Sequence, residues 1–529
     1  MSNTCENTAS IDATTCEKAV SIDAKMSPRT RWTYCFGGIG RDMAYSLFSG
    51  HMLTFIMLTR QIDAAMQAGI GIVMIICRIW DAFNDPIMGS IIENTRGKYG
   101  KFKPWILIGA ITNAIILVIM FTTKLQGWSF IIFFGLMFLL WDITFTMNDI
   151  GYWSMLPALT SNRADRDFTT SWANLLAGVG GGLGFAVIPF LTAGAYAIGG
   201  NAVTAYAVVS VIIAVCFIGC QVMTVLGVKE KAAPPPPPKV KGEGGLKKMF
   251  KVIAKNDQLL WVALIMLIYN LGGAGTQMLT MYIYLQFGYE GYFAMAFSVI
   301  FGISTGIPMI LYSLAAKKFK RRQILHLSII LIVFGYLCFF LTGVAWPMNF
   351  FVLAAWGIFI SIGQGFFYNI LTISISNTVE YNEWRTGKRE EAIIFSMRPL
   401  MAKLGTAIQI AIVTGVYFIL GIRNITNGIS EYENQVHQKL ITAAEKTEKI
   451  KELIATAGAD ATFWLRACIA FIPLVLIFIA YIIYLAKFKI DEEKYAVMIN
   501  EISEARAKNL GEPSEEQICE CGVEAVLSD

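Results

Sequence analysis

The sequence predicts an all-α polytopic membrane protein with twelve transmembrane helices in two six-helix halves. Composition, the spacing of apolar segments and the placement of basic loops each support this fold class. Of the 529 residues, 55% are hydrophobic and 15% are charged, whereas a soluble domain carries about 25% charged residues. These values exclude an ordinary soluble enzyme and a disordered or fibrous chain. The net charge of +5 is too small to indicate a nucleic-acid partner.

Apolar segments long enough to cross a bilayer recur along the chain, since a membrane-spanning helix needs roughly 20 apolar residues. Several are longer than that, which indicates tilted or kinked helices. The segments are 32–58, 66–92, 104–124, 128–157, 169–197, 202–227, 258–287, 291–316, 323–344, 347–377, 392–421 and 462–486.

Basic residues gather in alternate loops. These loops are 93–103, 228–257, 317–322 and 378–391. The other loops are short and nearly free of Lys and Arg, apart from 422–461. By the positive-inside rule, the basic loops and both termini are cytoplasmic and the protein lies in the cell membrane. Within the long loop, residues 430–456 are charged and Ala-rich, which predicts an external amphipathic helix.

Six spans, a long basic loop and six more spans predict five regions. They are a disordered cytoplasmic tail (1–31), an N-terminal half (32–227), a Pro/Lys-rich cytoplasmic linker (228–257), a C-terminal half (258–487) and a cytoplasmic tail (488–529). Two parallel six-helix halves with a substrate site near mid-membrane are the plan of the major facilitator superfamily.

Ionisable residues inside the spans are costly in hydrocarbon, so each is a functional hypothesis. They are Arg41, Asp42, Arg78, Asp81, Asp85, Asp142, Asp149, Arg398 and Lys403. Five of them come from four spans yet lie at one depth, roughly 10–17 Å from the cytoplasmic surface at 1.5 Å per residue. These five are Asp42, Asp81, Asp85, Asp149 and Lys403. We expect them to share one polar cavity.

The spacing of Asp81 and Asp85 points to a cation. Residues four apart on a helix place their Cβ atoms about 5–6 Å apart, and two such carboxylates repel unless one is protonated or both share a cation. Asp149 and Thr146 add oxygen ligands that hard cations prefer. Arg78 is expected to hold one carboxylate when no cation is bound. The alternative is a salt-bridge network that only fixes helix packing.

Three further residues near these acids suit a polar substrate. Trp153 lies one turn after Asp149, and a carboxylate beside an indole suits a sugar, which has apolar ring faces and a polar rim. Tyr368 lies in a polar stretch that fits a cavity wall. Asp142 precedes Asp149 by two turns on the same face, where it is a proton relay, a sugar-hydroxyl acceptor or an acid without a specific role.

Other motif-like features do not fit enzyme chemistry. The glycine run 178–184 lies within a span with no preceding strand, so it indicates close helix packing and not a dinucleotide site. The three His residues are dispersed, and no catalytic set or phosphate loop is present. The sequence therefore predicts no enzyme, no cofactor and no metal beyond a coupling cation.

Five stretches resemble the glycoside–pentoside–hexuronide:cation symporters of the major facilitator superfamily. They are Gly40–Asp42, Trp80–Gly89, Arg96–Trp105, Phe145–Trp153 and Asn377–Glu383 leading to Lys403, within a likeness over about residues 32–490. The resemblance implies a cation site of Asp81, Asp85, Asp149 and Thr146. It implies a sugar site of Asp42, Arg41, Asp149, Trp153 and Lys403.

Departures from the family pattern concern the sugar. Ser171 stands where a well-known member has a sugar-site arginine, so an α-galactoside is not implied. Arg398 and Tyr368 replace a glutamine and a tryptophan and complete the predicted sugar site. Because guanidinium pairs well with carboxylate, Arg398 indicates an acidic sugar such as a hexuronide.

The resulting expectation is a monomeric secondary active transporter. It would carry a glycoside, pentoside or hexuronide together with Na⁺, Li⁺ or H⁺ by alternating access, in contact with membrane lipid and without nucleic acid. Two alternatives stay open. One is a cation-coupled lysolipid symporter with an apolar, lipid-open cavity. The other is a non-transporting sensor that signals through the tail at 488–529.

Overall fold

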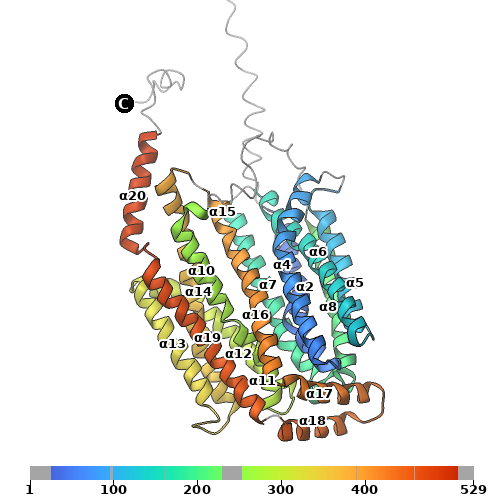
Figure 1. Cartoon of the computed structure of the whole chain (residues 1–529). Helices are drawn as coiled ribbons and strands as arrows, with labels where there is room; N and C mark the ends of the chain where they lie inside the picture. The colour runs from blue at the N-terminus through green and yellow to red at the C-terminus, as the bar shows by residue number, and fades with distance from the viewer. Residues whose placement is uncertain are drawn as a thin grey trace, which may run out of the picture.

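A computed structural model describes residues 26–95, 99–160, 163–228, 253–388, 390–457 and 459–509 of the chain (Figure 1). Apart from one isolated bridge between Thr342 and Trp346, their regular structure is helical. The predicted all-α class is therefore confirmed. The tail 1–25, residues 229–252 of the linker and residues 510–529 lie outside the described residues, so the predicted region boundaries stay predictions.

Helices of the first half run antiparallel along the bundle. They are α2 (Pro28–Tyr45), η1 (Ser46–Gly50), α3 (His51–Thr59), α4 (Ala64–Asn94), α5 (Lys103–Thr122), α6 (Gly127–Leu159), α7 (Arg163–Thr192), the short turns η2 (Gly194–Tyr196) and η3 (Ile198–Gly200), and α8 (Ala202–Gly227). Asp63 and Asn201 cap α4 and α8 through their side-chain oxygens, the usual N-cap residues.

The second half continues with the following elements. They are α10 (Asp257–Leu271), α11 (Ala274–Gln286), α12 (Gly291–Ala315), α13 (Arg321–Leu341), α14 (Phe350–Thr386), α15 (Glu391–Phe395), α16 (Met397–Ile419), α17 (Ile422–His437), α18 (Ala443–Ala457), α19 (Ala459–Lys487) and α20 (Glu492–Asn509). The helix α20 lies in the predicted C-terminal tail, at the end of the bundle opposite α17 and α18 (Figure 1).

Eleven helical segments of the described residues are long and apolar enough to cross a membrane. The twelfth predicted span, 32–58, corresponds to α2, η1 and α3, where a five-residue π-helix interrupts the α-helix. Its first helix carries Arg41 and Asp42, so it is less apolar than the others. With this segment, the described residues make the twelve predicted passes. π-Helical turns are frequent at functional sites.

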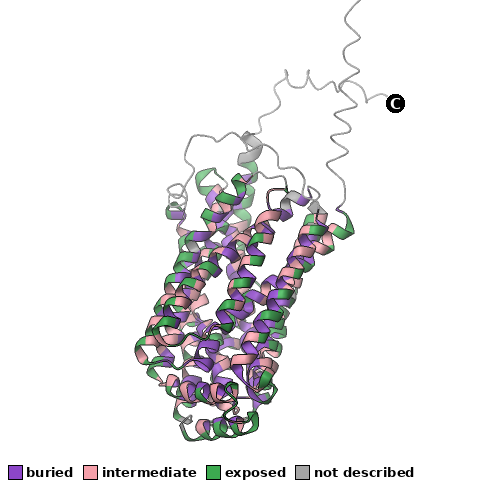
Figure 2. Ribbon diagram, turned by 90° about the vertical axis from the view of Figure 1, so that its right-hand side faces the viewer, coloured by how far each residue is buried: buried purple, intermediate pink, exposed green. Residues whose placement is uncertain are grey.

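The helices pack in two groups, which meet along two pairs of long helices and also where α17 contacts α3 and α8. In the first group, α2 packs on α7 and α8, and α6 packs on α4 and α5. In the second, α14 packs on α12 and α13, and α19 packs on α10 and α11. The pairs α4–α16 and α7–α12 join the groups. In Figure 2 the helices spread apart toward the end opposite α17 and α18.

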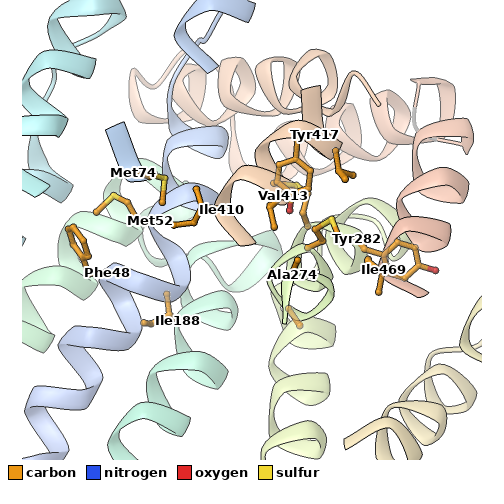
Figure 3. Packing of buried hydrophobic residues seen from close by; sticks show 14 of the residues in the cluster. Phe48, Met52, Met74, Ile188, Ala274, Tyr282, Ile410, Val413, Tyr417 and Ile469 are labelled. Carbon is orange, nitrogen blue, oxygen red and sulfur yellow. The ribbon is translucent and has the colours of Figure 1, made fainter. Parts of the chain in front are cut away.

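Buried apolar residues of both groups form one continuous cluster. Figure 3 shows Phe48, Met52, Met74 and Ile188 of the first half across from Ile410, Val413 and Tyr417 of the second. Close approaches between the halves include Gly71 against Thr414 and Gly291 against Pro189. Both lie toward the end of the bundle that carries α17 and α18, so the halves are in contact there.

The predicted single external helix at 430–456 is wrong: two helices, α17 and α18, occupy this region. Lys439 adopts a left-handed backbone conformation between them (φ 61°). Thr442 then starts α18. Its side-chain hydroxyl accepts from the Glu445 backbone N–H, and the Glu445 carboxylate accepts from the Thr442 backbone N–H. This Thr-x-x-Glu capping box is readable in the sequence.

The predicted close packing of the glycine run is confirmed on one face of α7. A Cβ atom at Gly180 would lie 2.2 Å from the Ile39 carbonyl oxygen, and one at Gly184 would lie 2.6 Å from Ser46. These two glycines let α7 approach α2 and η1 closely.

We expect Gly180→Ala to destabilise the protein by about 1–3 kcal/mol, because the backbone of α2 must shift to admit the methyl group. Gly182→Ala is the matched control, since nothing lies within 4 Å of its Cβ position. Thermal unfolding of both variants in detergent measures the effect. Equal midpoints for the two variants would contradict this packing.

Candidate functional site

A cavity of about 410 Å³ lies among α2, α4, α6, α7 and α16. Its lining residues are Asp42, Tyr45, Ser46, Arg78, Asp81, Asp85, Trp141, Phe145, Thr146, Asp149, Ala177, Gly178, Gly181, Phe185, Pro399 and Lys403. They include Thr146 and the five charged residues that the sequence places at one depth. The structure therefore brings the predicted polar layer together in one cavity.

Lys403 lies between the two carboxylates of α4. Its ammonium contacts Asp81 at 3.1 Å and makes a shorter contact with Asp85. The hydroxyl of Thr146 donates to Asp85 at 3.4 Å. Because Lys403 belongs to α16 and both acids belong to α4, these ion pairs join the two halves inside the bundle.

Arg41 pairs with the other two acids of the cavity. Its guanidinium lies 2.8 Å from Asp42 and 3.0 Å from Asp149. The rings of Tyr152 and Trp153 pack against the guanidinium, with distances of 4.8 and 5.0 Å from its carbon to the ring centroids. Arg41 is buried, and this paired setting offsets the cost of a charge in the bundle.

Arg78 does not hold a carboxylate, in contrast to the sequence-based expectation. Its guanidinium donates to the hydroxyl of Ser49 at 2.8 Å, in the π-helical turn η1. Spacing along one helix places Arg78 near Asp81, but Lys403 from the opposite half reaches that acid instead. Asp142 is buried, and both of its carboxylate oxygens have no hydrogen-bond partner among the described residues.

Four residues of the predicted sugar site do not line the cavity: Arg41, Trp153, Arg398 and Tyr368. Trp153 packs on Arg41 and on Tyr152. Arg398 donates to the hydroxyl of Tyr368 at 3.0 and 3.3 Å. Because Arg398 does not line this cavity, the cavity does not support an acidic sugar, and that expectation stays a prediction.

An aromatic wall of the cavity was missed by sequence reasoning. Phe145 stacks on Trp141 with ring centroids 4.8 Å apart and lies 5.3 Å from the ring of Tyr45. Residues 141, 145 and 149 are successive i,i+4 positions, so they share one face of α6. That spacing is readable in the sequence and places two aromatic rings on the face that carries Asp149.

Within the described residues, no group of three His, Cys, Asp or Glu side chains is arranged to hold a metal ion. Of the predicted cation ligands, Asp81 and Asp85 pair with Lys403, whereas Asp149 pairs with Arg41. The cavity thus contains two carboxylate pairs, each bound to one cationic side chain. Such a site can hold an external cation at a carboxylate pair only if the side-chain cation moves away.

Two helix bundles that enclose a charged cavity at their interface define a membrane transporter of the major-facilitator type. A family model described as "MFS/sugar transport protein" matches residues 33–492. The chain belongs to this family, which confirms its resemblance to the glycoside–pentoside–hexuronide:cation symporters. It is accordingly a transporter and not an enzyme.

Curated relatives are similar over most of the chain. The raffinose carrier protein of Pediococcus pentosaceus is 29% identical over 411 residues, 73% of this chain and 62% of the carrier. The lactose permease of Lactobacillus helveticus is 28% identical over 500 residues, 90% of this chain and 72% of the permease. The isoprimeverose transporter of Lactiplantibacillus pentosus is 26% identical, over 74% of this chain and 80% of the transporter.

Solved structures share the fold. A bacterial homologue of the human lysosomal transporter Spinster, in an inward-facing and occupied conformation, has a TM-score of 0.57 at 12% identity, covering 87% of this chain and 95% of that one. The nucleoside transporter NupG has a TM-score of 0.52 at 14% identity, covering 80% and 98%. The predicted major-facilitator fold is thereby confirmed.

We expect Lys403→Met to lower stability by about 1–3 kcal/mol in choline chloride, since it leaves two neighbouring carboxylates without a counter-charge in a partly wet cavity. NaCl or LiCl should restore part of the loss, because a small cation can take the place of the ammonium. Thermal unfolding midpoints in each salt measure this.

Arg398→Met is the matched control for Lys403→Met, because Arg398 bonds to a hydroxyl and not to a carboxylate. A change of salt should shift its unfolding midpoint no more than it shifts the midpoint of the unmodified protein. A salt response shared by both variants would contradict a cation site at Asp81 and Asp85.

Proposed function

We propose that this protein is a secondary active transporter that carries a sugar together with a monovalent cation by alternating access. One observation carries the proposal: a single ammonium, from Lys403 of one half, lies between two carboxylates of the other half. A pair of carboxylates that already holds one internal cation suits a Na⁺, a Li⁺ or a proton in its place.

Exchange of the internal cation would couple ion binding to movement of the halves. An ion that binds Asp81 and Asp85 displaces Lys403 and removes a polar link between α4 and α16. The carboxylates keep a counter-charge, whereas the displaced ammonium of Lys403 stays in the protein and needs water or another acceptor around it. The two halves are then free to rearrange around the cavity, as alternating access requires.

Sugar recognition would use the rest of the cavity. Phe145 and Tyr45 offer ring faces for the apolar face of a sugar, and Asp42 and Asp149 accept hydrogen bonds from hydroxyl groups. Gly178 and Gly181 leave space, since a Cβ atom at either position would meet nothing closer than 3.9 Å. The cavity volume of about 410 Å³ lies in the range of small-molecule sites.

The relatives support a glycoside as the substrate class, because those named above carry raffinose, lactose or isoprimeverose by their descriptions. The charged lining is unlike the apolar, lipid-open cavity that a lysolipid symporter needs. We place the protein in the cell membrane with cytoplasmic termini, on the strength of its basic loops. In this orientation the described conformation is closed at its external end.

Uptake of a labelled sugar panel in proteoliposomes tests the proposal. Galactosides, glucosides, xylosides and glucuronides would each be offered with an inward Na⁺ gradient, an inward H⁺ gradient or neither. We expect one class to accumulate under one gradient. If folded protein accumulates no sugar under any gradient, cation-coupled sugar symport is wrong.

We expect Asp85→Asn to keep the fold and to reduce gradient-driven accumulation to nearly none, since one of the two carboxylates that hold the cation is lost. Asp142→Asn is the matched control: it is the same change in the same bundle, at an acid with no hydrogen-bond partner among the described residues. This control should retain accumulation. Equal loss in both variants would remove the specific role of Asp85.

A further inference from the structure

The helices α17 and α18, residues 422–457, form a hairpin that lies across one end of the bundle (Figure 1). We call it the external hairpin. The chain joins it to α16 and α19, so it is covalently part of the second half. It nevertheless packs on the first half, since α17 contacts α3 and α8 and α18 contacts η2.

Polar contacts between α17 and the α3–α4 loop are direct and specific. The Asn427 side chain accepts from the Ile62 backbone N–H at 3.1 Å and donates to the Ile62 carbonyl at 2.8 Å. Gln61 donates to the Asn427 carbonyl at 2.7 Å, and Asn434 donates to the Thr59 carbonyl at 3.2 Å. The first half thus binds α17 through its backbone as well as its side chains.

A buried ion pair anchors the external hairpin to the start of α8. Glu433 of α17 and Lys446 of α18 are 3.1 Å apart, and both side chains are 0% exposed. Glu433 accepts from the Ala202 backbone N–H at 2.6 Å, and Lys446 donates to the Gly200 carbonyl at 2.8 Å. Separation of the hairpin from α8 would leave two buried charges without these partners, which is costly.

The ion pair between the external hairpin and the second half is more exposed than the Glu433–Lys446 pair. Lys451 of α18 pairs with Glu290 at 3.3 Å, but the lysine side chain is 53% exposed. Exposed ion pairs contribute little because water screens them. Tyr289, from the same loop of the second half, is buried close to Glu433, so this contact must open when the external hairpin parts from the second half. At the junction with α16, Gly421 adopts a left-handed conformation (φ 63°) that favours glycine.

Alternating access requires the external ends of the two halves to separate, so the external hairpin must part from one of them. We propose that it stays docked on the first half throughout the cycle, while α16 and α19 move against it. The external hairpin then acts as a strap that limits how far the external end opens. This inference rests on the proposed function, because it needs a protein that alternates between two openings.

Cross-linking of two cysteine pairs tests the strap. Thr204→Cys with His437→Cys lies across the docked interface, where the two native side chains are 3.1 Å apart. Glu290→Cys with Lys451→Cys lies across the interface that should open. Both pairs would be made in a variant whose ten native cysteines are replaced and that retains uptake, then treated outside with a short bifunctional thiol reagent.

We expect the 204–437 cross-link to leave the initial uptake rate within about twofold, and the 290–451 cross-link to reduce it by about tenfold or more, since it blocks the opening step. The reverse order would show that the external hairpin moves with the second half. Equal effects, whether both cross-links block or neither does, would also overturn the proposal.

A second readout separates this inference from the proposed function. Thr414→Cys lies at the external contact with Gly71, and an impermeant maleimide would label it only when the external end opens. The 290–451 cross-link should slow this labelling, and the 204–437 cross-link should not. If the uncross-linked protein accumulates no sugar, the proposed function is wrong, but the labelling rates still decide whether the strap exists.

Discussion

Charge neutralisation inside the bundle is the constraint on which the rest of the structure depends. An unpaired ion in a membrane interior is costly, so the pairing of an acid with a base stabilises the bundle even when the two lie on different helices. The pairing of Lys403 with Asp81 and Asp85 sets the position of α16 against α4. The pairing of Arg41 with Asp42 and Asp149 does the same for α2 and α6.

The sequence predicts the helices and the depth of the charged layer because both are local properties. A membrane span is recognised by the length of its apolar segment, and the depth of a charged residue within it follows from the rise per residue. Asp42, Asp81, Asp85, Asp149 and Lys403 therefore meet where they were expected. Position along a helix does not depend on which helices are neighbours.

Which charged side chains pair with each other depends on helix packing, and the sequence alone does not predict it. Arg78 is near Asp81 along α4, yet it bonds to Ser49 of the π-helical turn, and Lys403 from the other half takes its predicted place. The external hairpin illustrates the same limit. Its amphipathic character is readable, but a buried Glu433–Lys446 pair against α8 arises only when segments far apart in the chain meet.

The two kinds of contact between the halves suit different tasks. The link at the cavity is ionic, and under the proposed function a bound ion would replace it, so its strength would depend on the ions available. The external link combines apolar packing, backbone hydrogen bonds and a desolvated ion pair, which no small ion replaces. Under the proposed function, such a protein would release its halves at the cavity in response to a cation while the external hairpin keeps them connected. In the proposed symporter, coupling would reside in Lys403, because it alone among the described residues of α16 bonds to the acids of α4.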